Sequence, residues 1–353
     1  MTIPDPIELL TAMIKTPSIT GDTHAVQDVV AQWLVTHGVR EVVSDGDGIT
    51  ARVGPKDKPP LLLISHVDTV PVGEGWTVDP FGAEARDNLL YGRGSTDAGG
   101  AASAMAAATA ALAQSGDVPV LLFLSADEEG EWPKAHHAVP RFGEIAAAVV
   151  GEPTELNVGV SQRGLMVVEL ICRGMQGHAA HVEEPSAALL LAQDVARVGT
   201  LPFHETDVHL GGVKITPVRL SAGVADNVTP PVATALFDIR TIPAYGHDDI
   251  MERIRHAARH CEVRKVGCDW PAVRTPEGHP ILDAALSVTG GQALQGKAAS
   301  DWAFLGDIPA VKIGPGDTRI SHQPDEHVPM DQVRRAAEVY VELARRLSAG
   351  GDA

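Results

Sequence analysis

Cysteines and long apolar runs are scarce in this chain. It contains three cysteines, Cys172, Cys261 and Cys268, with no Cys-x-x-Cys spacing. A low, odd count of this kind argues against a disulfide framework and favours a reducing, cytoplasmic location. No apolar run approaches the ~20 residues of a membrane-spanning helix, and the N-terminus lacks the basic start and apolar stretch of a targeting signal. We therefore expect a cytoplasmic protein that does not cross a membrane.

Basic side chains are outnumbered by acidic ones. The chain has 28 lysines and arginines against 46 aspartates and glutamates, which leaves a formal net charge of −18. Such a charge argues against nucleic acid or an anionic membrane as a partner. A chain of 353 residues with 44% hydrophobic residues is long enough for two globular domains. We expect its partner to be a small molecule.

The first part of the chain alternates helix and strand signals. Apolar spacing predicts helices over residues 6–15 and 23–37, and fully apolar runs predict buried strands over 61–65 and 119–125. Between the two strands, residues 98–113 are rich in alanine and predict a helix that can pack closely on a sheet. This pattern indicates an α/β/α catalytic domain with a mixed sheet.

The pattern changes at Gly164 and returns near Thr275. The intervening order of strand, helix, strand, strand, helix and strand is that of a ferredoxin-like unit. We therefore predict an inserted lid or dimerisation domain at 164–273, between two parts of the catalytic domain at 1–163 and 274–353. The six elements are expected over residues 165–172, 185–198, 208–218, 232–241, 247–260 and 261–270.

Two histidines and three carboxylates each follow soon after a short apolar run. They are His66, Asp97, Glu129, Glu152 and His322. In open α/β sheets, ligand-binding residues collect at the carboxyl ends of the strands. Imidazole and carboxylate together suit zinc and related divalent ions. The five residues therefore predict one site for two metal ions, which forms only if the catalytic domain closes across its insertion.

Three of the segments also have simpler interpretations. His66 with Asp68 is typical of a ligating imidazole whose second N–H is held by a carboxylate, but also of a surface histidine beside a turn. Asp97 suits a helix N-cap as well as a bridge between cations ~3.5–4 Å apart. Glu128 and Glu129 point in opposite directions if extended, which predicts one ligand and one general base, but a solvated acidic turn is the alternative.

Several motifs together carry a family resemblance over essentially the whole chain. They are His66-Val-Asp-Thr-Val-Pro71, Tyr91-Gly-Arg-Gly-Ser-Thr-Asp97, Asp127-Glu-Glu-Gly130, Gly151-Glu-Pro-Thr154, Gly177-His-Ala179 and Gly314-Pro-Gly-Asp-Thr-Arg-Ile-Ser-His-Gln-Pro-Asp-Glu326. Together they resemble the two-zinc aminoacylase and carboxypeptidase family. That family includes acetylornithine deacetylase, succinyl-diaminopimelate desuccinylase and bacterial glutamate carboxypeptidases.

The resemblance implies a role for each metal-site residue. Two divalent ions, zinc with cobalt as the alternative, are bridged by Asp97, and the Asp97–Ala98 peptide is cis. His66 and Glu152 complete one metal position, and Glu129 and His322 complete the other. By the same resemblance, Glu128 is the general base and Asp68 supports His66.

The resemblance also assigns residues outside the metal site. His178, in the insertion, would be supplied by the partner subunit of a homodimer to polarise the scissile carbonyl, although a surface loop histidine is the alternative. Asn227 and Arg240 would contact substrate, and Gly314 and Gly316 would bring backbone N–H groups to it. Two departures are Gly99, where the family often has lysine, and the residues after His178, where its proline and asparagine are out of register.

These features predict a metal-dependent hydrolase that removes an N-acyl group from an amino acid in arginine or lysine biosynthesis. N2-acetylornithine or an N2-acyl-lysine is the first choice, including lysine linked to an acidic amino-group carrier protein. Succinyl-diaminopimelate desuccinylase is the alternative, with Arg163 and Arg319 as candidates for the succinyl carboxylate, followed by a carboxypeptidase or dipeptidase. A non-catalytic binding protein on the same fold is the alternative from another class.

Overall fold

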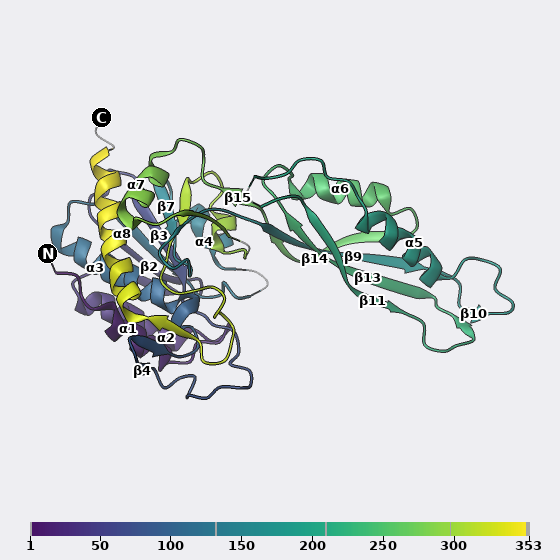
Figure 1. Cartoon of the computed structure of the whole chain (residues 1–353), viewed down its shortest axis with the longest axis horizontal. Coiled ribbons are helices and arrows are strands. Elements are labelled where there is room, and N and C mark those ends of the chain that lie inside the picture. Colours follow the sequence, from purple (N-terminus) through teal and green to yellow (C-terminus); the bar gives the residue numbers. More distant parts are fainter. Residues whose placement is uncertain (1, 131–132, 209, 297, 351–353) are drawn as a thin grey trace. The chain divides into compact units, whose positions relative to one another are not determined.

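The computed structural model describes residues 2–130, 133–208, 210–296 and 298–350, and the chain forms two compact units (Figure 1). The first, here called the α/β unit, comprises Met1–Val160, Arg274–Gln295 and Ser300–Ala353. The second, here called the inserted unit, comprises Ser161–Val273 with Gly296–Ala299. Each unit has its own hydrophobic core.

A mixed sheet forms the centre of the α/β unit. Strands β6, β3, β7 and β17 run parallel to one another, and β1, β2 and β8 pair antiparallel with their neighbours. Every residue of β3 and β6 is buried, as strands covered on both faces require. The order is β1 (Glu41–Asp45), β2 (Gly48–Val53), β6 (Val120–Ser125), β3 (Leu61–His66), β7 (Ala147–Val150), β17 (Ala310–Lys312), β8 (Val158–Gln162) and β15 (Val273–Arg274), with β16 (Ala293–Gly296) also on β8.

Helices rich in small residues cover this sheet. Helix α3 (Gly100–Ser115) buries 13 consecutive residues, Gly100 to Leu112, because its alanines permit close contact on all sides. It starts two residues later than the sequence predicts, because Ser95–Gly99 forms a π-type turn that contains the cis peptide Asp97–Ala98. The other helices are α1 (Pro6–Ile14), α2 (His24–Thr36), α4 (Ala135–Ala138), α7 (Pro280–Thr289) and α8 (Met330–Gly350), with short 3-10 turns at Val139–Arg141 and Asp301–Phe304.

The inserted unit confirms the ferredoxin-like order. Its antiparallel sheet runs β11 (Lys214–Ala222), β13 (Val232–Thr241), β9 (Gly164–Arg173) and β14 (Glu262–Trp270), and α5 (Ala187–Gly199) and α6 (His247–Ala257) complete the unit (Figure 1). Burial alternates along β9 and β13, since one face of the sheet meets the core.

The strand expected over 208–218 was misplaced. It starts at Lys214 because Asp207 and Gly211 pair in a tight turn and the Asp207 carboxylate accepts the N–H of Leu210 at 2.9 Å. His209, also in the expected strand, lies outside the described residues.

Two small sheets complete the fold. Strands β18 (His327–Pro329), β5 (Leu89–Tyr91) and β4 (Glu84–Arg86) form one, and β10 (Gly177–His178) with β12 (Val228–Thr229) forms the other. Among the described residues, no helix combines the length and the apolar character needed to cross a membrane.

Candidate metal centre

Four neighbouring strands of the α/β unit end at one edge of its sheet and deliver the candidate ligands there. His66 is the last residue of β3, and Glu152 lies two residues beyond β7. Glu128 and Glu129 follow the end of β6, and His322 follows β17 by ten residues. Because β6, β3, β7 and β17 are adjacent and parallel, residues far apart in sequence converge at their carboxyl ends.

Asp97 lies between the two histidines. Its Oδ1 is 3.3 Å from Nε2 of His66, and its Oδ2 is 3.3 Å from Nε2 of His322. Glu129 Oε1 lies 2.7 Å from the same His322 nitrogen, and Glu152 Oε1 lies 4.0 Å from Nε2 of His66. The Asp97 carboxylate therefore faces two separate pairs of potential metal ligands, His66 with Glu152 and His322 with Glu129. A ligand that bridges two metal ions must have this arrangement.

Within the part of the chain that the structure describes, three groups of ligand atoms lie close enough together to hold a cation. His66, Asp97 and Glu152 form the first, here called the inner position, and Asp97, Glu129 and His322 form the second, here called the outer position. The third, which contains His66, Glu128 and Glu129, shows that Glu128 is also within reach. In each group the donor atoms lie within 4.8 Å of one another, so the side chains present fit two divalent ions that share Asp97.

Asp68 positions both His66 and the two glutamates. Nδ1 of His66 lies 3.0 Å from the carbonyl oxygen of Asp68 and 3.4 Å from its carboxylate, which leaves Nε2 facing Asp97. The Asp68 carboxylate accepts the backbone N–H groups of Glu128 and Glu129, both at 3.0 Å, and the hydroxyl of Thr20 at 2.8 Å. Asp68 therefore joins the ends of β3 and β6, a contact that was not predicted from the sequence.

A buried ion pair holds the loop that carries Asp97. The N–H groups of Thr96 and Asp97 donate to Oε1 of Glu326 at 3.0 and 3.1 Å, and Oε2 of Glu326 pairs with Arg93 at 2.5 Å. Arg93 also donates to the carbonyl of His322 at 3.5 Å, so this pair ties the Asp97 loop to the His322 loop. Neither role was predicted from the sequence, although Arg93 and Glu326 both lie inside motifs that carry the family resemblance.

Excess negative charge dominates the electrostatics of the site. Burial, followed by Asp97, raises the pKa of Glu152 to about 7, and burial with the nearby acids Glu152 and Glu129 raises that of Glu128 well above its usual range. The carboxylates of Asp97 and Glu129 raise the pKa of His322 to about 10. Crowded carboxylates of this kind are stabilised by bound cations.

Two further charged groups of the centre were not predicted. Asp301, in the turn Asp301–Phe304, is 1% exposed, and burial raises its pKa to about 8. Lys312, the last residue of β17, is 5% exposed. Lys312 could have been found from the sequence, because it is a charged residue within an otherwise apolar strand. No comparable pattern surrounds Asp301.

The glycines expected to bring N–H groups to substrate are engaged otherwise. The N–H of Gly314 donates to the Thr154 hydroxyl at 3.1 Å, and that of Gly316 donates to Gln332 at 2.9 Å. A Cβ on Gly314 would lie 2.4 Å from the carbonyl oxygen of Glu152, so this position must be glycine for packing. Both N–H groups are therefore bonded within the protein, and a role of Gly314 and Gly316 in substrate binding stays a prediction.

Gly99 has a steric reason. A Cβ there would lie 2.5 Å from the carbonyl oxygen of Gly94 and 3.1 Å from Cδ1 of Leu10. This backbone has no room for the lysine that the resemblance leads one to expect.

In the inserted unit, the structure brings together only some of the predicted lid residues. The carbonyl of Asn227 accepts the N–H of Ala179, next to His178. Arg240 is far from them, because β13 separates it from Val232 by eight residues, roughly 26 Å of extended chain. Its guanidinium makes a two-point ion pair with Asp238, at 2.8 and 3.0 Å.

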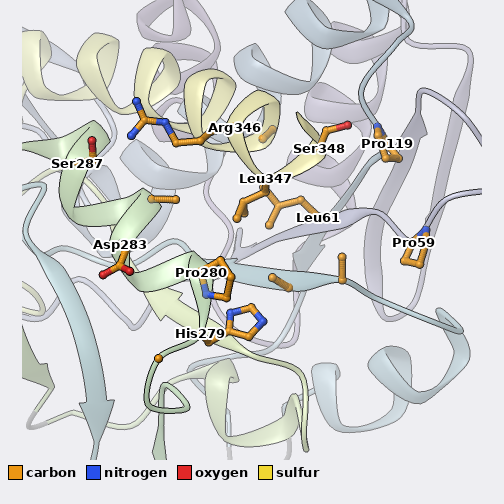
Figure 2. A pocket seen from close by; sticks show the side chains of 15 residues that line it. Pro59, Leu61, Pro119, His279, Pro280, Asp283, Ser287, Arg346, Leu347 and Ser348 are labelled. Atoms are coloured by element: carbon orange, nitrogen blue, oxygen red, sulfur yellow. The ribbon is translucent and has the colours of Figure 1, made fainter. Parts of the chain in front are cut away.

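A cavity of about 650 Å³ lies elsewhere in the α/β unit (Figure 2). Leu61 and Ala147, the first residues of β3 and β7, line it together with Pro280 of α7 and Leu347 of α8. The cavity therefore lies at the amino ends of these strands, whereas His66 and the other candidate ligands lie at the carboxyl ends. None of the candidate ligands lines it.

Comparison with known proteins gives a family and a shared fold. The family model described as peptidase family M20/M25/M40 matches residues 62–346. Two relatives are succinyl-diaminopimelate desuccinylases: one from Acidiphilium cryptum is 31% identical over 98% of this chain and 100% of the relative, and one from Novosphingobium aromaticivorans is 32% identical over 98% and 99%.

Solved structures support the architecture. An M20 family metallo-carboxypeptidase from Sulfolobus solfataricus is 18% identical with a TM-score of 0.76, covering 98% of this chain and 100% of that one. A dinuclear metal-binding M20 peptidase from Bacillus subtilis is 17% identical with a TM-score of 0.77, covering 98% and 97%. These similarities confirm the predicted fold class.

Proposed function

We propose that this chain, which belongs to the peptidase family M20/M25/M40, removes the succinyl group from an N-succinyl amino acid. Members of this family are metal-dependent hydrolases that use two divalent ions. One observation carries the choice of acyl group. Both relatives described above are named succinyl-diaminopimelate desuccinylase, and the match covers nearly all of each chain. N-succinyl-diaminopimelate is therefore the proposed substrate, with a role in lysine biosynthesis.

This proposal reverses the order of preference from the sequence analysis. N2-acetylornithine and N2-acyl-lysine ranked first there, but the comparisons favour the alternative. A lysine carried by an acidic protein is disfavoured further, because the net charge of −18 on this chain would repel such a partner.

We assign His66, Asp97 and Glu152 to the inner metal position and Asp97, Glu129 and His322 to the outer one. Two divalent cations, for which we propose zinc, supply positive charge that polarises the amide carbonyl and makes a water molecule a stronger acid. Asp97 is suited to bridging because one of its oxygens faces each histidine, at 3.3 Å in both cases.

Glu128 moves the proton in this proposal. Its side chain is buried, and its backbone N–H is fixed by Asp68 at 3.0 Å, so the carboxylate has a defined position beside the ligands. It accepts a proton from the attacking water and delivers it to the leaving nitrogen, the task of a general base that then acts as an acid.

His178 has the correct tautomer for an oxyanion donor. Its Nδ1 accepts the N–H of Ala180 at 3.2 Å, so a neutral ring carries its proton on Nε2 and can donate it to the substrate carbonyl. We propose that His178 acts at the site of the partner subunit in a homodimer. The edge strand β11 supports this assembly, because it exposes Val218 and Leu220 at 56% and 62% and offers unpaired backbone groups.

Arg319 is the better placed of the two candidates for the succinyl carboxylate. Arg163 donates to the carbonyls of Gly212 and Leu210 in the inserted unit. Arg319 lies three residues before His322 with its side chain 80% exposed, and among the described residues its guanidinium pairs with Asp317 alone. A substrate carboxylate can replace Asp317 on this guanidinium.

A substrate comparison tests the proposal. We expect kcat/KM for N-succinyl-diaminopimelate to exceed that for N-acetylornithine, N-acetyl-lysine and a set of dipeptides by at least about 10²-fold. Arg319→Ala should raise KM for the succinyl substrate and leave KM for an acetyl substrate unchanged. Preference for an acetylated amino acid or a dipeptide would overturn the choice of acyl group.

Subunit complementation tests the assignment of His178. Inactive His178→Ala and inactive Glu128→Ala chains are mixed under conditions that allow exchange. A mixed dimer then has one site that lacks both groups and one with both intact, so activity should recover toward roughly a quarter of wild type per total site. A fully active monomer, or no recovery after proven exchange, contradicts the shared site.

A further inference from the structure

Lys312 is a buried lysine at the metal centre that has no task in the mechanism above. Its side chain is 5% exposed at the end of β17. No ion pair within 4.0 Å joins it to any residue in the described ranges 2–130, 133–208, 210–296 and 298–350. Arg93, the other buried cation nearby, is already paired with Glu326. Lys312 is therefore a positive charge that no single structural partner neutralises.

The fold directs Lys312 toward the inner metal position. In the sheet it pairs with Val150 of β7, two residues before Glu152, and with Gly159 of β8. A Cβ on Gly159 would lie 2.8 Å from Cβ of Lys312, so the glycine leaves room for the lysine stem. Burial lowers the pKa of Lys312, and among the acids that oppose this effect Glu152 contributes most.

The two metal positions therefore differ in charge. Each has one carboxylate of its own, Glu152 or Glu129, and each shares Asp97. The inner position has Lys312 beside its carboxylate, because Lys312 pairs with Val150, two residues before Glu152, whereas Glu129 follows β6, which β3 and β7 separate from β17. One additional unit of positive charge is thus directed at the inner position.

We propose that Lys312 makes the two positions unequal, by weakening divalent-cation binding at the inner position and leaving the outer one little changed. This inference rests on the ligand assignment proposed above and not on the proposed substrate. Lys312 acts through the field at Glu152 and the cation, so it is a positioning residue.

The sign of the effect follows from Coulomb's law. Lys312 favours the ionised form of Glu152, which helps a cation to bind, but it also repels that cation. At comparable separations the repulsion of a divalent ion is about twice the attraction of a single carboxylate. Removal of the ammonium group should therefore strengthen binding at the inner position.

The experiment isolates each position in the full chain. His322→Ala keeps His66, Asp97 and Glu152, whereas His66→Ala keeps the outer ligands. Metal-stripped protein of each background, with and without Lys312→Met, is titrated with Co²⁺ at one pH, followed by calorimetry and by the visible absorption of the bound ion. We expect Lys312→Met to tighten binding at least about tenfold in the His322→Ala background and less than about threefold in the other.

Two control substitutions distinguish the effect of charge at position 312 from the effect of side-chain shape. Lys312→Gln is neutral with a different shape and should repeat the effect, whereas Lys312→Arg keeps the charge and should bind Co²⁺ like the parent. Circular dichroism and thermal unfolding show which variants fold. Equal changes in both backgrounds, no change, or weaker binding at the inner position overturns the proposal. Because no substrate is used, an error in the proposed reaction cannot produce any of these results.

Discussion

The two units both bury carboxylates, but they surround them differently. In the inserted unit, Asp194 is 0% exposed and accepts the backbone N–H groups of Arg259, His260 and Cys261 at 3.1, 2.8 and 2.8 Å. The guanidinium of Arg197 donates to it as well. These donors together satisfy the buried charge, and Asp194 joins α5 to the loop before β14.

In the α/β unit, Asp68 and Glu326 have donors of this kind, but no backbone N–H group donates to the side chain of Glu152 or Asp301 among the described residues. Within the described residues, the one basic nitrogen within 4.0 Å of the Glu152 carboxylate is Nε2 of His66, and burial raises the pKa of Glu152 to about 7. Burial likewise raises the pKa of Asp301 to about 8. A buried carboxylate with its own donors is structural, whereas several that converge without donors mark a place for cations. This contrast separates the metal centre from the other acids of the chain.

Removal of the metal ions should produce the largest effect, and this effect should differ between the two units. We expect chelation to lower turnover by at least about 10³-fold, because the charge that the ions supply is worth several kcal/mol in the transition state. It should also speed amide hydrogen exchange at the ends of β3, β6 and β7 and leave β9 and β14 unchanged. Equal loss of protection in both units would show that the centre does not depend on cations for its order.

Replacement of Glu128 should distinguish the role of a general base from the role of a metal ligand. Glu128→Gln keeps the size of the side chain and removes its ability to accept a proton. Turnover should fall by about 10²–10⁴-fold while two metal ions per chain remain, measured by steady-state kinetics and elemental analysis. Glu129→Gln is the matched control and should lose metal from the outer position. The reverse pattern would mean that the two neighbouring acids have exchanged roles.

Most of the fold and the convergence of the ligands could be predicted from the sequence. The apolar runs before His66 and Glu129 predicted buried strands, and the structure shows that these strands are parallel, so their ends lie together. The cis peptide at Asp97–Ala98 was predicted from the resemblance and is confirmed. The start of β11 was misplaced, because the Asp207 turn that delays it depends on hydrogen bonds that apolar spacing does not reveal.

The hydrogen bonds that hold the candidate ligands in place could not be predicted in the same way. Glu326 and Thr96 are 230 residues apart, and Thr20 and Asp68 are 48 apart, yet each pair is joined by a hydrogen bond. No local pattern records such contacts, since they follow from how loops pack at the sheet edge. The charged Lys312 within an apolar strand was a visible exception and could have been interpreted as a buried functional group.

Asp68 offers a smaller test of that support. Asp68→Asn removes the charge and places an amide where the N–H groups of Glu128 and Glu129 need an acceptor. We expect metal affinity or activity to fall by about 10–100-fold, as for other groups that orient ligands. Thr20→Val is the control, because it removes only the 2.8 Å hydroxyl bond to Asp68 and should cost less. A larger loss in Thr20→Val would contradict this role of Asp68.

The smallest effect on activity is expected at Asp194, whose role is structural. Burial alone would raise its pKa, but the N–H groups of residues 259–261 and Arg197 lower it to about 2, below the ordinary value of 3.8. The folded inserted unit therefore binds fewer protons than the unfolded one. The stabilisation is fully present above about pH 4 and is lost as pH falls toward 2, and it amounts to about 2 kcal/mol.

Asp194→Asn tests this assignment through stability and not through catalysis. The amide keeps the size of the side chain but accepts fewer hydrogen bonds, so the inserted unit should lose about 2 kcal/mol at neutral pH, while turnover changes less than about twofold. Hydrogen exchange in β9 and β14 measures the loss. Between pH 4 and 2, stability should fall less steeply in the variant than in the parent, because the titrating group is gone. Arg197→Met, which removes one partner and leaves the backbone donors, should show an intermediate loss. An unchanged acid profile in Asp194→Asn would show that other carboxylates control the acid sensitivity of this unit, and the contrast between the two kinds of buried acid would then fail at Asp194.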